Sequence, residues 1–415
     1  MIGPRTIVVV GGGLIGAASA LRLQAAGFAV TLIDPGDHRR AASFGNAGHI
    51  AAEQCEPMPS PATLKAAPGL LFGRGGPLDF RLTDAPMLAS WAPRFLASAR
   101  PERSEAIGNA LRSLLREPLE SWARLTELAC APSVVRPTGH NVVWMDATAA
   151  RNGFAAWSRA STGTARFRPL EAEELAAYEG VIAKPPAGGV RFTGTGQVSE
   201  PKAAFDALIA DFVRRGGRIH LGEVTTLQSG SADVRALFAD GSAIEADLLL
   251  VAAGAWSGRL MATLGVHAPI IGERGYSMQS REHNWPANLP TTVFEERSLV
   301  LAPFDEGLRA TSFVEFGNPD APPDTRKWNR LGKHLSALGV RFSGAPDRWM
   351  GPRPTLPDYL PAIGRLQKNP RILYAFGHQH LGLTLTAVTA ELVEAMAMGR
   401  APSINLTPFR IERFA

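Results

Sequence analysis

Cysteine is scarce in this chain, and long apolar runs are missing. Only Cys55 and Cys130 occur among its 415 residues, too few for a disulfide framework or an iron–sulfur cluster, so we expect a reducing, cytoplasmic setting. The longest apolar stretch, Leu248 to Trp256, is far shorter than the roughly 18 residues that span a bilayer. The first apolar run begins soon after Met1, which leaves no room for a signal peptide. We expect no metal site.

Runs of one charge sign are also missing. The formal net charge is +5, with 20% charged and 45% apolar residues, and the basic residues are interspersed with acids. No nucleic-acid-binding module is visible, so we expect no nucleic-acid partner. The positive balance favours anionic substrates or surfaces, including peripheral contact with the cytoplasmic face of the inner membrane. The length predicts two domains or one large composite.

The N-terminal residues carry the clearest motif. A β-branched apolar run, Ile7 to Val10, precedes Gly11-Gly12-Gly13-Leu14-Ile15-Gly16, and a helical pattern then leads to a second apolar run, Val30 to Ile33. This order predicts strand, tight turn, helix and strand, the arrangement of a dinucleotide-binding unit.

Each glycine of this motif has an expected purpose. Gly11 permits the turn, Gly13 lets a pyrophosphate approach the backbone, and Gly16 lets the helix pack closely on the sheet. Asp34 follows at about the 20-residue spacing of a carboxylate that accepts from a ribose hydroxyl, which disfavours NADP. The motif alone does not separate NAD from FAD.

The middle of the chain predicts a second domain inserted into the first. Prolines and glycines between residues 58 and 80 predict irregular structure, most simply a connector, with a lid or a membrane-touching loop as alternatives. Apolar periodicity predicts a helix over 104–128, kinked or divided at Pro118. A strand at 140–145 and helices at 147–160 and 171–179 follow.

The nucleotide-binding pattern resumes near residue 197. A helix from Ser199, a hairpin turning at Asp240-Gly241 and a buried strand at 248–251 predict this return. Strands and turns over 266–345 belong with the inserted domain. We therefore assign 1–52, 197–265 and 346–415 to the cofactor domain, and 53–196 and 266–345 to the substrate domain.

The last seventy residues also resemble part of a site. Three prolines stiffen the segment 352–357 around Arg353, which lowers the entropy lost in fixing that side chain. After a strand at 372–375, Gly377 to Thr384 leads into a helix whose N-terminus can stabilise negative charge.

Six motifs in order resemble one family: VVVGGGLIG at 8–16, SFGNAG at 43–48, AAGAWS at 252–257, ERGY at 273–276, MGPRPTLPDYLPAIG at 350–364 and FGHQHLGLTLT at 376–386. They resemble the FAD-dependent D-amino-acid oxidase/dehydrogenase superfamily, and within it bacterial D-amino-acid and D-hydroxyproline dehydrogenases. The resemblance selects FAD over NAD. It implies an α/β fold with a glutathione-reductase-type Rossmann FAD-binding domain and an inserted α+β substrate domain.

The resemblance also assigns residues. Together with the fingerprint it implies that FAD contacts Gly11, Gly13, Leu14, Ile15, Gly16, Asp34, Ser43, Asn46, Ala47, Gly48, Val224, Ala253, Gly254, Trp256, Gly377, Gly382, Leu383 and Thr384. Arg353 matches the arginine that pairs with the substrate carboxylate, helped by Tyr276 and His380. His49 and His378 complete the candidate catalytic set. Gln379 stands where many relatives have glycine, which alters the expected pocket.

The implied reaction oxidises a D-amino or D-imino acid, including D-proline or D-hydroxyproline, by hydride transfer from Cα to flavin N5. Electrons then pass to a quinone or another acceptor. An oxygen-using oxidase of secondary amines, glycine or opines is the same-scaffold alternative. An NAD-linked dehydrogenase and a non-catalytic flavin subunit are remoter alternatives.

Overall fold

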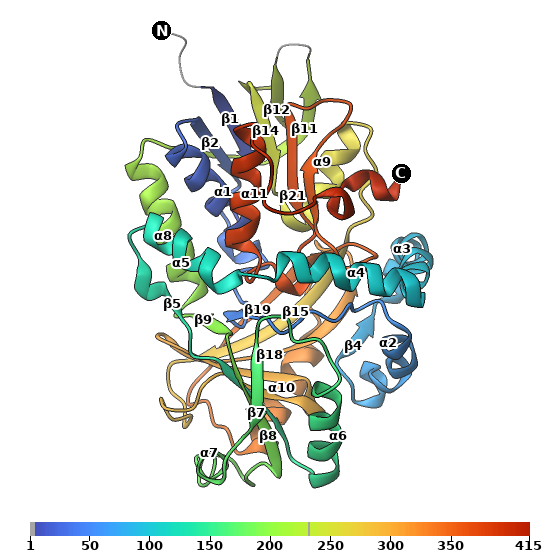
Figure 1. The fold of residues 1–415 in the computed structure, drawn as a ribbon, viewed down its shortest axis with the longest axis vertical. Helices are drawn as coiled ribbons and strands as arrows, with labels where there is room; N and C mark the ends of the chain where they lie inside the picture. Colours follow the sequence, from blue (N-terminus) through green and yellow to red (C-terminus); the bar gives the residue numbers. More distant parts are fainter. Residues whose placement is uncertain (1–4, 231–232) are drawn as a thin grey trace.

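The computed structural model describes residues 5–230 and 233–415, and it contains two main sheets (Figure 1). The first has six strands in the order β10-β2-β1-β14-β21-β20. Its parallel strands are β1 (Thr6–Val10), β2 (Ala29–Asp34), β10 (Arg218–Leu221), β14 (Leu248–Val251) and β21 (Ile372–Phe376); β20 (Ala362–Arg365) runs antiparallel to β21. Strands from three distant parts of the chain thus form one sheet, as the interrupted pattern predicts.

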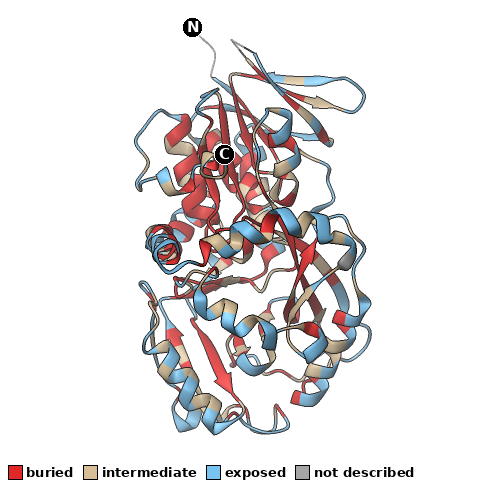
Figure 2. Cartoon of the chain, turned by 90° about the vertical axis from the view of Figure 1, so that its right-hand side faces the viewer, coloured by how far each residue is buried: buried red, intermediate tan, exposed pale blue. Residues whose placement is uncertain are grey.

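Alternation along β1 explains the layers around this sheet. Ile7 and Val9 point to a core shared with α1 (Leu14–Ala25), α8 (Pro201–Arg214) and α11 (Thr386–Ala397). Val8 and Val10 point to the opposite core, under α9 (Ser257–Thr263) and the meander β11 (Val224–Ser229), β12 (Val234–Phe238) and β13 (Ala243–Ala246). Because side chains alternate along a strand, both faces of the sheet are buried, and Figure 2 shows this half with a continuous buried centre.

The second sheet has nine strands. Its path is β19 (Asp347–Thr355), β15 (Ile271–Ser280), β18 (Gly307–Gly317), β17 (Leu299–Phe304), β16 (Thr292–Phe294), β6 (His140–Trp144), β8 (Gly188–Thr193) and β7 (Arg166–Pro169), with β4 (Leu78–Phe80) paired to β18. The amphipathic helix α10 (Thr325–Leu338) packs Leu331 and Leu335 against Tyr276 and Met278 of β15. The fold class expected from the sequence is confirmed.

Helices α4 (Pro101–Leu114) and α5 (Pro118–Leu128) form a band across the middle of the molecule in Figure 1, and α3 (Ala85–Ser98) lies at its right-hand end. The predicted 104–128 helix is divided at Pro118, which is the first residue of α5, where its missing N–H costs nothing. The other helices are α2 (Pro61–Ala66), α6 (Ala147–Trp157) and α7 (Ala172–Ala176). A small sheet joins β3 (His49–Ile50), β9 (Gly196–Val198) and β5 (Val135–Arg136).

The segment 58–80 holds only short regular elements, among them α2 and β4, as its prolines and glycines predict, and Phe72 is buried against α10. Two other predictions need correction. The strands and turns predicted over 266–345 are interrupted by the helix α10. Residues 347–355, assigned to the cofactor domain, form β19 of the nine-stranded sheet. The assigned boundary at 346 therefore does not match sheet membership, and Arg353 belongs to the sheet opposite the nucleotide-binding one.

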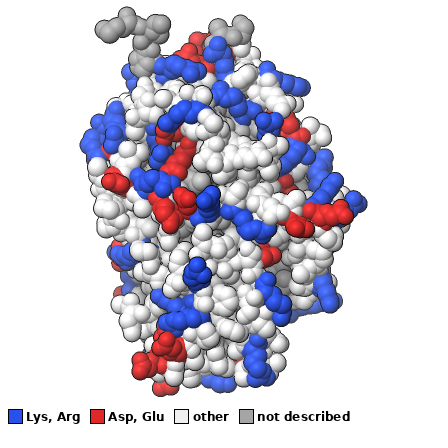
Figure 3. Space-filling view, in the orientation of Figure 1, with Lys and Arg blue, Asp and Glu red and all other residues white. Residues whose placement is uncertain are grey.

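The outer surface carries both charge signs. Figure 3 shows acidic and basic side chains interleaved over the face it displays. Within the described residues, no helix combines the length and apolar character needed to cross a membrane.

Candidate active site

A cavity of about 390 Å³ opens at the carboxyl ends of β1 and β14, where open α/β sheets bind their ligands. Fifteen of the predicted residues line it: Gly11, Gly13, Leu14, Ile15, Asp34, Ser43, Asn46, Val224, Ala253, Gly254, Trp256, Arg353, His378, Gly382 and Leu383. Eight others are not among its lining residues: Gly16, Ala47, Gly48, His49, Tyr276, Gly377, His380 and Thr384. The structure therefore gathers distant parts of the sequence around one cavity.

The glycines fit a dinucleotide. Gly11 has φ +109°, and a Cβ there would lie 2.4 Å from the Ala252 carbonyl oxygen. A Cβ on Gly13 would meet no atom within 4 Å, because this residue faces open space at the N-terminus of α1. A Cβ on Gly16 would lie 1.8 Å from the Gly11 carbonyl oxygen. Gly11 and Gly16 thus shape the turn, whereas Gly13 leaves room for phosphate at a helix N-terminus.

Asp34 is held at the end of β2. Its carboxylate accepts hydrogen bonds from the backbone N–H groups of Gly12 and Gly36, each at 2.8 Å. These bonds fix the carboxylate on the cavity wall while leaving acceptor capacity for a ribose hydroxyl. The residues present therefore fit an adenine dinucleotide.

The loop at 43–48 is fastened from the opposite sheet. Arg309 of β18, 4% exposed, donates to the carbonyl oxygens of Asn46 (2.6 Å) and Phe44 (3.3 Å). It also pairs with Glu200 at 2.9 Å. It donates as well to Gln279 Oε1 of β15. Sequence reasoning missed Arg309, since no local motif marks it, and the loop carbonyls and Glu200 lie more than 100 residues away in the sequence.

Arg353 reaches the cavity wall from β19. Its Nη1 donates to Glu273 Oε1 at 3.1 Å and to the Phe313 carbonyl oxygen at 3.3 Å. Its Nη2 and Nε have no hydrogen-bond partner in residues 5–230 and 233–415. A Cβ on Gly275 would lie 2.3 Å from Nη2, so glycine at that position makes room for the guanidinium. One edge of Arg353 is therefore fixed while another edge stays free.

Glu273 was missed by sequence reasoning although it lies in the ERGY motif. It is 2% exposed, and it also accepts from Thr355 Oγ1 at 3.1 Å and Tyr359 Oη at 3.2 Å. Burial and the neighbouring Glu273 raise the pKa of Tyr359 well above its usual value. Alternation along β15 is a signal that could have separated Glu273 from Tyr276.

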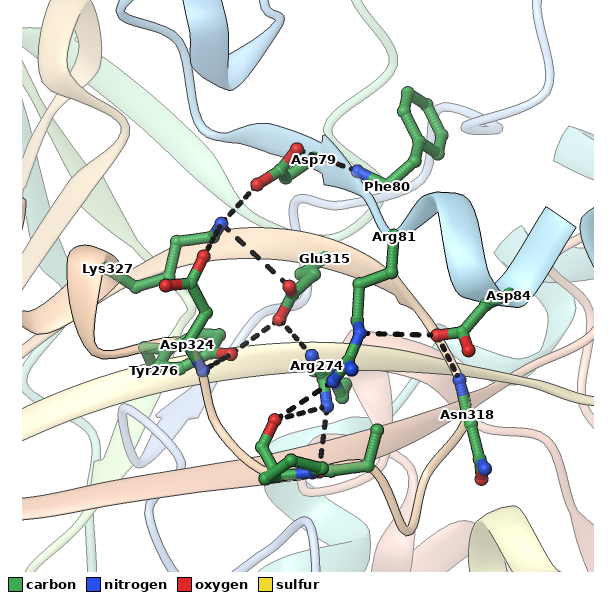
Figure 4. Close-up of polar contacts among 12 residues, drawn as sticks. Asp79, Phe80, Arg81, Asp84, Arg274, Tyr276, Glu315, Asn318, Asp324 and Lys327 are labelled. Atoms are coloured by element: carbon green, nitrogen blue, oxygen red, sulfur yellow. Dashed lines mark hydrogen bonds and ion pairs between the residues drawn. The ribbon is translucent and has the colours of Figure 1, made fainter.

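The placement of Tyr276 differs from the prediction. Its hydroxyl donates to Glu315 Oε2 and accepts from the Asp324 N–H at 3.0 Å. These contacts belong to a buried network that includes Arg274, Lys327 and Asp79 (Figure 4). Burial, followed by the Glu315 hydrogen bond, raises the pKa of Tyr276 well above its usual value. Its side chain faces α10, and the structure does not bring it to the cavity.

The histidines of the C-terminal segment are neutral in this environment. Burial lowers the pKa of His378 to about 3 and of His380 to about 4, with Glu273 opposing the shift of His380. His378 Nε2 lies 3.0 Å from Thr389 Oγ1. Of these two histidines, His378 is among the lining residues of the cavity and His380 is not. The ring centroid of His380 lies 6.5 Å from that of Tyr359.

His49 lies in β3, directly after the cavity loop. Its Nε2 contacts Glu53 Oε1 at 3.1 Å, and its ring meets that of His140 edge to face. Thr384 follows Leu383, which lines the cavity, and its Oγ1 accepts a hydrogen bond from Ala51 N at 2.9 Å. Gly48 and Gly377, with φ of +72° and +80°, shape the backbone at these two places.

Fold and cavity together define a dinucleotide-dependent enzyme of the Rossmann type. A family model described as "FAD dependent oxidoreductase" (DAO) matches residues 6–396, and the chain belongs to that family. The protein is therefore an FAD-dependent oxidoreductase, and the resemblance found in the sequence is confirmed. FAD, not NAD, is its cofactor.

Several relatives match almost the whole chain. A D-amino-acid oxidase of Bradyrhizobium diazoefficiens is 31% identical, over 99% of each chain. A D-amino acid dehydrogenase of Paramagnetospirillum magneticum is 29% identical, over 98% of each.

Solved structures share the fold. The iminodiacetate oxidase of Chelativorans sp. BNC1 superposes with a TM-score of 0.72 at 17% identity, covering 97% of this chain and 98% of that one. The glycine oxidase of Geobacillus kaustophilus gives 0.70 at 21% identity, with 98% coverage of each.

Proposed function

We propose that this protein oxidises a D-amino or D-imino acid at its Cα–N bond, giving the imino acid. The observation that carries the proposal is that Arg353 lines the cavity, with no hydrogen-bond partner for its Nη2 and Nε among the described residues. A guanidinium edge binds a carboxylate through paired N–H groups. The names of the curated relatives, D-amino-acid oxidase and D-amino acid dehydrogenase, support the same substrate class.

The chain's own residues bind and orient the substrate. Arg353 holds the carboxylate, and Glu273 holds Arg353 by its other edge. The neutral imidazole of His378 sits on the cavity wall and carries no charge that would repel an ammonium group. Gly11, Gly13 and Asp34 would hold the adenosine and phosphate part of FAD, which supplies the two-electron acceptor when bound. Arg353 thereby converts the reaction into one between preoriented partners.

Within this class we favour cyclic D-imino acids, D-proline and D-hydroxyproline, on the strength of the Gly377–Thr386 segment. Electrons then pass to a quinone or another carrier. A quinone acceptor and the net charge of +5 both favour a cytoplasmic protein that makes peripheral contact with the inner membrane.

Anaerobic reduction of the bound flavin tests the proposal. The holoenzyme is mixed with D- and L-amino acids, D- and L-proline, hydroxyproline isomers, sarcosine, glycine and iminodiacetate, and loss of the flavin absorbance is followed. Bleaching by D-isomers alone supports the proposal. Bleaching by sarcosine, glycine or iminodiacetate but not by D-amino acids favours the secondary-amine oxidase instead. Readmitting air, or adding a soluble quinone, identifies the acceptor.

Arg353→Met tests the carboxylate contact. A desolvated charge pair of this kind costs roughly 2–5 kcal/mol to truncate, so kcat/KM should fall by roughly 30-fold to several thousand-fold. Arg353→Lys keeps the positive charge but lacks the planar pair of N–H donors. Its kcat/KM should therefore lie between that of the parent and that of Arg353→Met. A kcat/KM within threefold of the parent for every substrate would refute the assignment.

A further inference from the structure

One buried carboxylate lacks the partner that all similar ones have. Among the described residues, six acids are almost fully buried: Glu53, Glu200, Asp211, Glu273, Glu315 and Asp358. All except Glu53 pair with an arginine or lysine. Glu53, 3% exposed, has only imidazoles beside it. Because a buried charge is costly unless it is compensated, this carboxylate can accommodate a cation that no lysine or arginine among the described residues supplies.

Two imidazoles converge on Glu53 from different elements. His49 Nε2 of β3 lies 3.1 Å from Glu53 Oε1, and His140 Nε2 of β6 lies 3.8 Å from the same oxygen. Two ligand atoms of a tetrahedral zinc ion lie about 3.3 Å apart, given metal–ligand distances of about 2.0 Å. The observed distances bracket that value, and the three ligand atoms all lie within 4.8 Å of one another.

Two further observations indicate that these residues could bind a ligand. Glu53 Oε2 is buried and has no hydrogen-bond partner among the described residues. His140 Nδ1 lies 3.1 Å from Thr195 Oγ1. Such a hydroxyl fixes the imidazole ring and presents the other nitrogen, as the outer partners of metal-bound histidines do.

The other cluster of comparable geometry shows the contrast. Asp79, Glu315 and Asp324 also bring three ligand atoms together, but the Lys327 ammonium lies among them (Figure 4). That cluster holds its own cation. The His49–Glu53–His140 cluster contains no lysine or arginine.

We propose that His49, Glu53 and His140 bind a divalent transition metal, zinc above all. Two imidazole nitrogens and one carboxylate form a ligand set that zinc uses, whereas Mg²⁺ and Ca²⁺ favour oxygen ligands. The fourth position is taken by Glu53 Oε2 or a water. The ion would tie β3, which follows the cavity loop, to β6 of the nine-stranded sheet. This inference goes beyond the proposed function and does not depend on it.

Metal analysis tests the site without using activity. The holoenzyme is purified without a histidine tag, stripped with a chelator, incubated with ZnSO₄ and desalted, and zinc and flavin are measured per chain. We expect one zinc per chain in the parent and in His220→Gln, which alters an exposed histidine of β10. Glu53→Gln and His140→Gln should lose that zinc while retaining FAD.

Two results would overturn the proposal: no zinc in the parent, or an undiminished zinc content in both cluster variants. If the variants fail to fold, X-ray absorption of the zinc-loaded parent decides. Coordination by nitrogen and oxygen with two imidazoles supports the site, and any sulfur ligand or a lack of imidazole refutes it. Added zinc should also raise the Tm of the parent by binding the folded state, and it should not raise the Tm of His140→Gln.

Discussion

At the scale of single residues, the pair of Arg353 and Glu273 has two consequences that can be separated. The contact at 3.1 Å is buried on the Glu273 side. Removing one partner of a buried pair leaves an uncompensated charge and costs about 3–5 kcal/mol of stability. Arg353→Met should therefore lower both activity and the free energy of unfolding.

The double variant Arg353→Met/Glu273→Gln separates them. It also removes the charge of Glu273, which Arg353→Met leaves unpaired. Urea unfolding should therefore show part of the lost stability restored. The value of kcat/KM should stay low, because no guanidinium remains. Recovery of kcat/KM together with stability would show that Arg353 acts only through the fold.

A second residue-scale prediction concerns acid. His378 is buried and neutral in the folded protein, with a pKa lowered from 6.5 to about 3. The unfolded chain binds a proton there below about pH 6.5 and the folded chain does not, so stability falls as the pH drops from 6.5 toward 3. His378→Gln should lessen this fall by up to about 1.4 kcal/mol per pH unit. Urea unfolding at pH 7, 6 and 5 with saturating FAD measures it, and identical slopes in the two proteins would count against the buried neutral histidine.

At the scale of elements, the glycines around the start of α1 serve two purposes, one for the ligand and one for the fold. A Cβ on Gly13 enters open space, whereas a Cβ on Gly16 collides with the Gly11 backbone. Gly13→Ala should keep the Tm of the FAD-free protein within a few degrees and weaken FAD binding at least tenfold. Gly16→Ala should lower the Tm of the FAD-free protein itself. Thermal unfolding and flavin titration distinguish the two, and equal loss of Tm in both variants would contradict this division.

Much of the nucleotide-binding half could be predicted because its signals are local. The run of glycines, the spacing to Asp34 and the hairpin at Asp240-Gly241 each depend on neighbouring residues. Contacts across the two sheets could not be predicted in this way. Glu273 pairs with Arg353, and Arg309 with Glu200 and the 43–48 loop, across separations that only the folded chain closes.

Tyr276 shows a second limit. The ERGY motif at 273–276 marks a strand beside the site, but a motif does not say which face of the sheet each residue occupies. Glu273 faces Arg353, and Tyr276 faces α10. Alternation along β15 decides between them, and the strand's boundaries and register came only from the structure.

At the scale of the whole molecule, Arg309 joins the two halves at the cofactor cavity. From the nine-stranded sheet it holds two carbonyl oxygens of the loop at 43–48, and it pairs with Glu200 at the start of α8. The loop has no equivalent contact to its own sheet in the described hydrogen bonds. Retention of FAD should therefore depend on a side chain of the opposite sheet.

Two variants separate loop anchoring from the ion pair. Arg309→Met removes both the carbonyl contacts and the pair, whereas Glu200→Gln removes only the pair's charge and leaves the guanidinium on the loop. Both should lower the Tm, because each disrupts a buried charge pair. Only Arg309→Met should weaken FAD binding, by about tenfold or more for two lost charge-assisted hydrogen bonds. Flavin titration of the FAD-free proteins measures this. An equal rise in Kd in both variants would mean that general loosening, not the hold on Asn46 and Phe44, governs how the two halves keep the cofactor.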